Sequence, residues 1–172
     1  LAKIISVIAH PILLPTLMLL IFIASGIFKI AALRMDICLA VVFGTTFLLP
    51  VLILLLLKKI KLIKSLTMER RDERFIPLFI MVISLYVTSR FFNGVIPLLL
   101  YNFYLICNLI LCVVVFWINL YWKISLHGIG WGAFVSMLFI MTSISSNMYL
   151  IYFFVSILMS GIVGWARLKL KS

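Results

Sequence analysis

The chain has 172 residues, of which 66% are hydrophobic and 11% are charged. Uncharged apolar runs of about 20 residues exceed what a water-soluble core requires and are typical of a polytopic membrane protein. The net charge of +11 would suggest nucleic-acid binding in a soluble protein, but here the charges lie in short loops beside apolar runs, where lipid head groups and orientation explain them. We therefore predict an all-α polytopic membrane helix bundle, a single domain over residues 1–172, with membrane lipids rather than nucleic acid as partners.

The first predicted span covers residues 4–28, which is too long for a signal peptide and has no small-residue cleavage pattern after it. Because the chain begins with Leu1 and not with Met, we expect its natural start to lie upstream. Pro11 and Pro15 are about one turn apart and predict a kink or break. His10 precedes this break and is a possible accessory site residue that faces a polar cavity. The alternative is an interfacial histidine.

The second and third spans are predicted at residues 37–57 and 75–92, on either side of a polar segment at residues 67–77. This segment holds three of the four acidic residues and a cluster of arginines, and so dense a polar island cannot lie in hydrocarbon. We expect it at a membrane face. It is either an anion site, with its carboxylates holding the arginine side chains in place, or a solvated salt-bridged loop.

Three further spans are predicted at residues 97–120, 128–144 and 148–166, which brings the total to six. The fourth ends in the aromatic residues Trp117, Tyr121 and Trp122, which suit head-group depth. The sixth carries serines and glycines suited to close helix packing. The cysteines at positions 38, 107 and 112 lie inside apolar runs and show no metal-ligand spacing, so we expect neither a metal site nor a cofactor.

The distribution of lysine and arginine predicts the orientation. With six spans and the N-terminus inside, twelve basic residues fall on the inner face and three on the outer face. The positive-inside rule therefore predicts both ends of this chain in the cytoplasm, in a bacterial inner membrane. Arginines kept for catalysis would not have been placed for topology, and the count would then overstate this bias.

Three polar clusters fall on one predicted membrane face. They are the arginines before the third span, Ser125 and His127 before the fifth span, and Arg167 after the sixth. Arginine side chains bind phosphate oxygens, and a histidine can protonate a leaving oxygen or attack phosphorus. These residue types are the ones that phosphoryl chemistry requires.

Short motifs in this order resemble the type 2 phosphatidic acid phosphatase superfamily, above all a compact bacterial branch with segments similar to His10 through Pro15 and Met68 through Pro77. Ser125-Leu126-His127 is similar to the family motif Pro-Ser-Gly-His, with Ile124 at the proline position. Ala166-Arg167 is similar to the Ser-Arg that opens the third motif. Lys64 and Arg71 match the spacing of the first motif, although Asp72 replaces its proline and Arg74 is an equal candidate.

The resemblance implies a metal-independent hydrolase that acts on a lipid or isoprenyl phosphate. It implies that His127 is the general acid and that Arg167 stabilises the phosphate during catalysis. The phosphate-binding residues would be Lys64, Arg71, Arg74, Ser125 and Gly128. The nucleophile would be the histidine of the third motif, one position beyond Ser172. Either the chain continues there into a further span, or the protein has no nucleophile. We also expect the arginine and histidine tips to lie within roughly 10 Å of one another, the span of one bound phosphate.

Two other function classes fit the composition. One is a non-catalytic accessory subunit of a larger membrane complex, whose small-residue faces pack against partner subunits. The other is a small anion transporter. A histidine directly after Ser172, followed by a further apolar span, would favour the enzyme, whereas a stop codon there would favour the accessory subunit.

Overall fold

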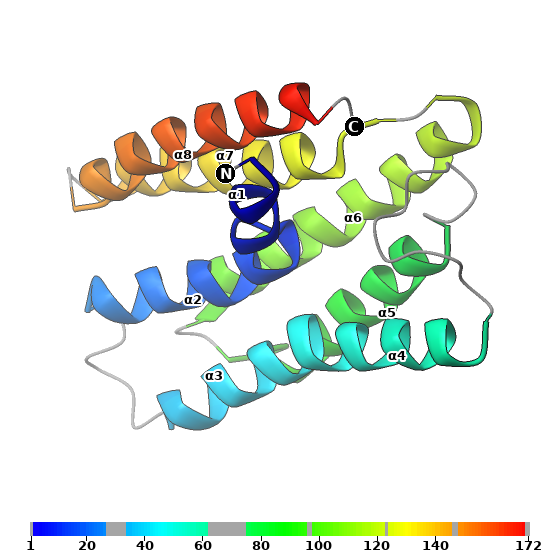
Figure 1. Cartoon of the computed structure of the whole chain (residues 1–172). Coiled ribbons are helices and arrows are strands. Elements are labelled where there is room, and N and C mark those ends of the chain that lie inside the picture. Colours follow the sequence, from blue (N-terminus) through cyan, green and yellow to red (C-terminus); the bar gives the residue numbers. More distant parts are fainter. Residues whose placement is uncertain are drawn as a thin grey trace. The chain divides into compact units, whose positions relative to one another are not determined.

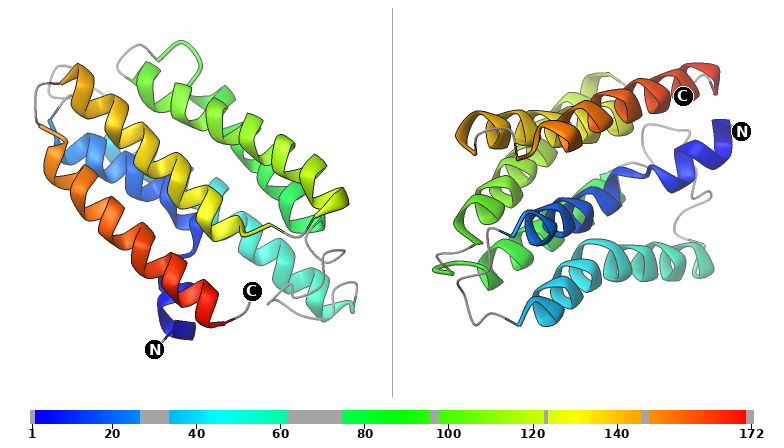
Figure 2. Two further views of the ribbon diagram at one scale, coloured as in Figure 1. Left: turned by 90° about the horizontal axis from the view of Figure 1, so that it is seen from above. Right: turned by 90° about the vertical axis from the view of Figure 1, so that its left-hand side faces the viewer.

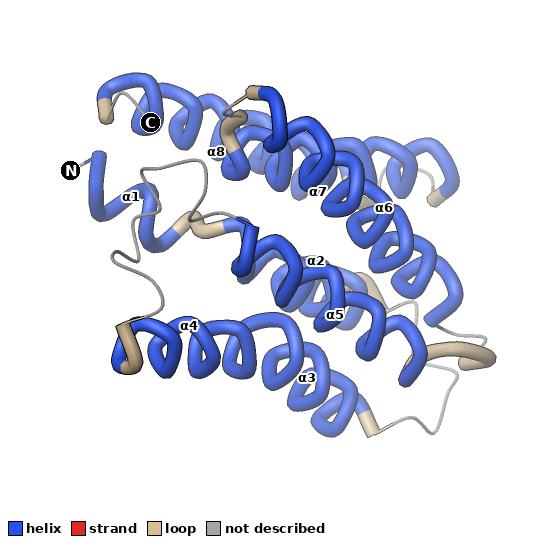
Figure 3. The backbone as a smooth tube through the Cα atoms, turned by 90° about the vertical axis from the view of Figure 1, so that its right-hand side faces the viewer, coloured by secondary structure: helices blue, strands red, loops and turns tan. Residues whose placement is uncertain are grey.

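The computed structural model describes residues 2–26, 34–61, 75–95, 98–122, 124–145 and 148–170. All regular elements in these ranges are helical (Figure 1; Figure 3). Five helical segments are long and apolar enough to cross a membrane: Ile4–Ala24, Met35–Lys59, Leu99–Tyr121, Leu126–Ile144 and Leu150–Lys169. A shorter apolar helix, Phe75–Phe91, has 17 residues. The protein is therefore an all-α polytopic membrane protein, as its composition predicts.

The chain forms two compact units. The first combines Leu1–Ile30 with Ser125–Ser172, and the second is Ala31–Ile124. The ends of the sequence therefore fold together, while the middle of the chain forms its own helical unit. The prediction of a single domain over residues 1–172 stays a prediction.

The first unit contains α1 (Ala2–Ile8), the 3₁₀ helix η1 (Pro11–Leu13), α2 (Leu14–Ala24), α7 (Leu126–Ile144) and α8 (Leu150–Lys169). Helices α7 and α8 are joined by a short connection and lie antiparallel, side by side (Figure 2). Helix α1 packs against α8, whereas η1 and α2 pack against α7. Most buried side chains of this unit are apolar, and they include Met18, Phe22, Phe134, Leu138 and Met141.

The break between α1 and η1 follows from the sequence. Proline has no backbone N–H, and its ring disfavours the helical conformation of the residue before it. His10, which precedes Pro11, is accordingly extended, with φ −66° and ψ 131°. The first span is therefore two helical pieces around His10, and the predicted kink is confirmed.

The second unit contains α3 (Met35–Phe43), the π-helical turn η2 (Gly44–Leu48), α4 (Leu49–Lys59), α5 (Phe75–Phe91) and α6 (Leu99–Tyr121). Pro50 cannot donate a helical hydrogen bond to the carbonyl four residues earlier, which accounts for the irregular turn in front of it. The hydroxyl of Thr45 in η2 lies 2.6 Å from that of Thr88 in α5. Helix α5 packs along α6, and Phe92 meets Tyr101 edge to face near their connection.

Candidate functional site

His10 sits at the break in the first span, where it caps η1. Its Nδ1 accepts a hydrogen bond from the backbone N–H of Ile12 at 3.3 Å. A nitrogen that accepts a hydrogen bond carries no proton, so the neutral ring must carry its proton on Nε2. The side chain is exposed. His10 therefore presents a hydrogen-bond donor at the edge of the first unit.

His127 lies in the first turn of α7 and is buried. Its Nε2 is 3.0 Å from the backbone carbonyl oxygen of Ser6 and 3.4 Å from the Ser6 hydroxyl. Because a carbonyl oxygen can only accept, His127 donates through Nε2. This bond connects the beginning of α7 to α1.

Arg167 comes from the last turn of α8. Its Nη1 donates to the hydroxyl of Ser6 at 3.1 Å. Its Nε is buried and has no hydrogen-bond partner among the described residues. A buried donor without an acceptor is costly, so this nitrogen favours an anionic ligand beside it.

These contacts define one cluster, which we call the Ser6 cluster: Ser6, His10, His127 and Arg167. The Ser6 hydroxyl lies between His127 and Arg167, and the rings of His10 and His127 meet edge to face with their centres 5.0 Å apart. Three chain segments, α1 with its break, α7 and α8, thus bring two imidazoles, a guanidinium and a hydroxyl together. Guanidinium, imidazole and hydroxyl groups are donors of the kind that proteins use to bind phosphate.

Packing between η1 and α7 fixes the distance between the two histidines. Gly130 lies one turn after His127, and a Cβ at Gly130 would stand 2.6 Å from the Cβ of Pro11. Only glycine allows this approach. The indole nitrogen of Trp131 also donates to the carbonyl of Ala9 at 3.0 Å. His127 and Trp131 are four residues apart on one face of α7. Both bond carbonyls at the end of α1, just before the break.

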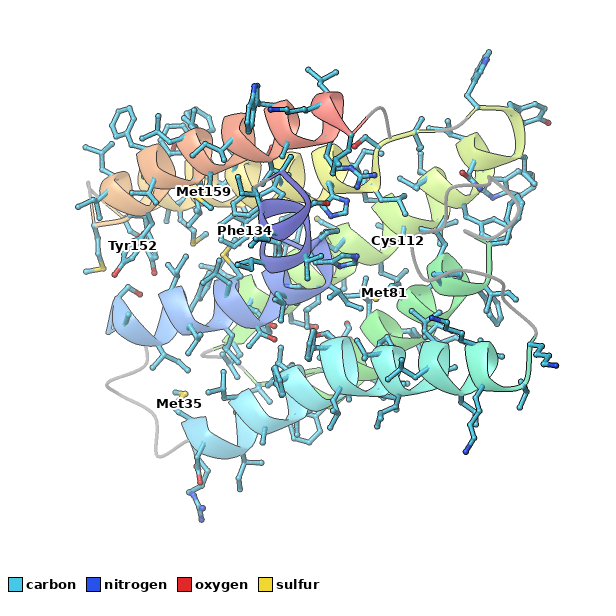
Figure 4. All side chains as sticks on the ribbon, in the orientation of Figure 1. Met35, Met81, Cys112, Phe134, Tyr152 and Met159 are labelled. Atoms are coloured by element: carbon cyan, nitrogen blue, oxygen red, sulfur yellow. The ribbon has the colours of Figure 1, made fainter. Side chains whose placement is uncertain are left out.

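An apolar pocket of about 350 Å³ opens beside the Ser6 cluster. His10 forms part of its wall, and the remaining lining residues include Leu17 of α2, Trp131 of α7 and Met159 of α8. Figure 4 shows Met159 on α8 and Phe134 on α7 within the same unit. A single side chain, His10, therefore faces both the polar cluster and the apolar pocket.

The end of α8 that carries Arg167 has the features of a membrane interface. The Lys169 ammonium lies 5.2 Å from the ring centre of Trp165, whose side chain is exposed. Tryptophan with a neighbouring lysine is typical of head-group depth. Since α7 and α8 are antiparallel, the first turn of α7, with His127, lies at the same end of the pair. The Ser6 cluster thus lies near a membrane face.

Ser125 and Gly128, which are also predicted for the site, bond to each other at the start of α7. The Ser125 hydroxyl caps α7 by accepting a hydrogen bond from the backbone N–H of Gly128 at 3.4 Å. Their predicted contribution to phosphate binding stays a prediction. Lys64, Arg71 and Arg74 lie outside the described residues.

Ser6, which makes the connecting contacts, is not among the residues predicted for the site. One signal was present: Ser6 is the polar residue one helical turn before His10 in an otherwise apolar run. Its partners are more than 100 positions away in the sequence, at separations of 121 and 161. Local patterns do not reveal contacts of that range.

In comparisons with known proteins, no family model, no curated protein and no solved structure matches this chain. The function is therefore inferred from the geometry of the Ser6 cluster and from the motifs in the sequence.

Proposed function

We propose that this protein is a membrane-embedded, phosphatase-like protein that binds the phosphate group of a lipid or isoprenyl phosphate. The observation that carries the proposal is the meeting of His10, His127 and Arg167 around one serine hydroxyl. Two of these residues, His127 and Arg167, occupy the positions that the motif resemblance assigns to phosphate chemistry.

The roles follow from the hydrogen-bond geometry. Arg167 already donates to Ser6 through Nη1, and its Nε and Nη2 protons can be offered to phosphate oxygens. His10 carries its proton on Nε2 and can offer it to a further phosphate oxygen. A phosphate placed here would receive donors from two chain segments that the fold already holds in position.

The chemistry would be transfer of the phosphoryl group from the lipid alcohol to the third-motif histidine that the resemblance implies. Hydrolysis of the phosphohistidine would follow. In the first step the bond between phosphorus and the alcohol oxygen breaks, and a protonated His127 supplies the proton to that oxygen. Arg167 stabilises the negative charge on the equatorial oxygens of the phosphoryl group while this bond breaks. The resemblance implies no metal in either step. The resemblance also assigns Arg71 and Arg74 to phosphate binding, and both lie outside the described residues.

The lipid character of the substrate is supported by the apolar pocket beside His10. About 350 Å³ of space next to a phosphate site suits part of a hydrocarbon chain, because pockets of this size and lining bind apolar groups. A water-soluble phosphate ester would leave that pocket unused. Placement in a bacterial inner membrane with both ends of this chain in the cytoplasm is part of the same proposal.

A specific observation supports a second function, that of a non-catalytic accessory subunit. His127 and Trp131 both bond carbonyls of the broken first span, so His127 has a structural role even without a ligand. In that case the cluster would hold α1 against α7 and α8 and would bind no phosphate.

The experiment compares variants in proteoliposomes that contain a lipid phosphate, with lipid binding and release of inorganic phosphate as readouts. Arg167→Ala should weaken binding by about ten- to hundredfold, the value of a charged hydrogen bond. Lys169→Ala is the matched control, since it removes the same charge from the same helical turn. Equal losses in the two variants would indicate a diffuse basic surface and would contradict the proposal.

His127→Gln separates the two functions. A glutamine amide can still donate to the Ser6 carbonyl, but it cannot exchange a proton with a leaving alcohol. The phosphatase proposal expects a folded protein that binds lipid phosphate and releases no inorganic phosphate. A wild-type protein that neither binds nor hydrolyses lipid phosphate would favour the accessory subunit.

A further inference from the structure

We propose that Ser6 is the positioning residue of the phosphate site: it holds Arg167 and His127 in one arrangement before a ligand arrives. This inference rests on the proposed function. It adds a residue that none of the motifs contains. This residue lies on α1, to which the motif resemblance assigns no role.

The hydrogen bonds of Ser6 differ from those of serines within α7 and α8. A serine in an apolar helix usually donates to a carbonyl three or four residues earlier in the same helix. Ser136, Ser156 and Ser160 do so, at 2.7 to 2.8 Å. The Ser6 hydroxyl instead contacts His127 of α7 and Arg167 of α8, and it is 7% exposed. Its position is therefore set by long-range partners.

The two polar groups of Ser6 act on two different residues. Its backbone carbonyl accepts from His127 Nε2 at 3.0 Å, which fixes the orientation of the imidazole. Its hydroxyl accepts from Arg167 Nη1 at 3.1 Å, which fixes one arm of the guanidinium. A planar guanidinium held through one arm directs its remaining N–H groups along defined lines.

Such restraint matters because a free arginine has many rotamers. Ordering a long charged side chain costs conformational entropy, and a binding site that has already ordered it does not incur that cost when the ligand binds. Removing the hydroxyl should therefore weaken phosphate binding even though Ser6 need not touch the phosphate.

The test uses the full chain in lipid nanodiscs, with inorganic phosphate as the probe. Ser6→Ala should weaken phosphate binding by about ten- to hundredfold. Ser6→Thr retains a hydroxyl and should recover most of the affinity. Ser156→Ala is the matched control, because Ser156 is also buried in the same unit and its hydroxyl donates to Phe153 of its own helix. Wild-type affinity in Ser6→Ala would overturn the inference.

A double-mutant cycle shows whether Ser6 acts through Arg167. In an Arg167→Gln background, Ser6→Ala should cause little further loss of affinity. Full, independent losses in the double variant would contradict a positioning role.

A second readout does not depend on phosphate. In ¹⁵N-arginine spectra of the ligand-free protein, the Arg167 Nη signals, assigned from Arg167→Gln, should be resolved in the wild type and in Ser6→Thr. In Ser6→Ala, where the guanidinium is no longer held, the Arg167 Nη signals should merge into an averaged signal. If the wild type binds no phosphate, the proposed function fails, and these spectra still decide the role of Ser6: unchanged Arg167 signals in Ser6→Ala would refute it.

Discussion

At the scale of single residues, Gly130 determines how closely η1 approaches α7. A Cβ there would lie 2.6 Å from the Cβ of Pro11, which is closer than two non-bonded carbon atoms can approach. Both atoms belong to rigid parts of the chain, so relief requires the helices to move apart. His10 and His127 would separate with them.

We therefore expect Gly130→Ala to lower the free energy of unfolding by about 1–3 kcal/mol, the usual cost of overpacking. Unfolding in mixed detergent micelles measures it. Gly132→Ala is the control, because no atom lies within 4 Å of its added Cβ and it belongs to the same helix. A Gly130→Ala protein as stable as Gly132→Ala would show that η1 does not pack against α7 in this way.

Three residues of the Ser6 cluster could be chosen from the sequence because polar groups are rare in apolar runs. His10, His127 and Arg167 stand out for that reason, and two of them also lie in motifs. Ser6 could not be chosen, because serine is common in membrane helices and usually satisfies itself within its own helix. The contacts between these residues join the two ends of the chain, and neither spacing nor periodicity predicts them.

At the scale of elements, the apolar runs predict the helices well and their internal irregularities less well. A run of uncharged residues must form a helix in the membrane because every backbone group needs a partner there. The break at His10 was predictable from Pro11. The π-helical turn η2 was not, although Pro50 accounts for it, since the length of a run carries no information on where its helix is interrupted.

The hydroxyl pair of Thr45 and Thr88 should connect η2 to α5. We expect the variants Thr45→Val and Thr88→Val to be coupled by about 0.6–1.7 kcal/mol in a double-mutant cycle of unfolding, the range found for hydrogen bonds between membrane helices. Thr46→Val paired with Thr88→Val is the control, because the Thr46 hydroxyl donates to Val42 within its own helix segment. Coupling that is equal in the two cycles would refute a specific contact.

At the scale of the whole molecule, the orientation in the membrane decides which compartment the Ser6 cluster faces. The end of α8 with Arg167, Lys169 and Trp165 is predicted to be cytoplasmic, and the connection between α7 and α8 is predicted to lie on the other side. The basic residues of the chain favour this orientation by twelve to three.

Cysteine labelling in intact cells tests the orientation. In a background without Cys38, Cys107 and Cys112, an impermeant reagent should label Ser145→Cys and should leave Leu170→Cys unlabelled until the membrane is permeabilised. Ser145 caps the end of α7 and Leu170 caps the end of α8, so the two positions lie at opposite ends of this antiparallel pair. The reverse pattern would place the Ser6 cluster on the outer face.

One measurement tests the central claim, that the Ser6 cluster is a phosphate site, most directly. The chain contains two histidines, and both belong to the cluster, so spectra of ¹⁵N-histidine-labelled protein report on the site alone. On titration of the wild type in nanodiscs with inorganic phosphate, the ring signals of His10 and His127 should shift with one common midpoint. Arg167→Gln should move that midpoint to higher phosphate concentration, whereas Lys169→Ala should not. Histidine signals that stay unchanged throughout the millimolar range would contradict a phosphate site at this cluster.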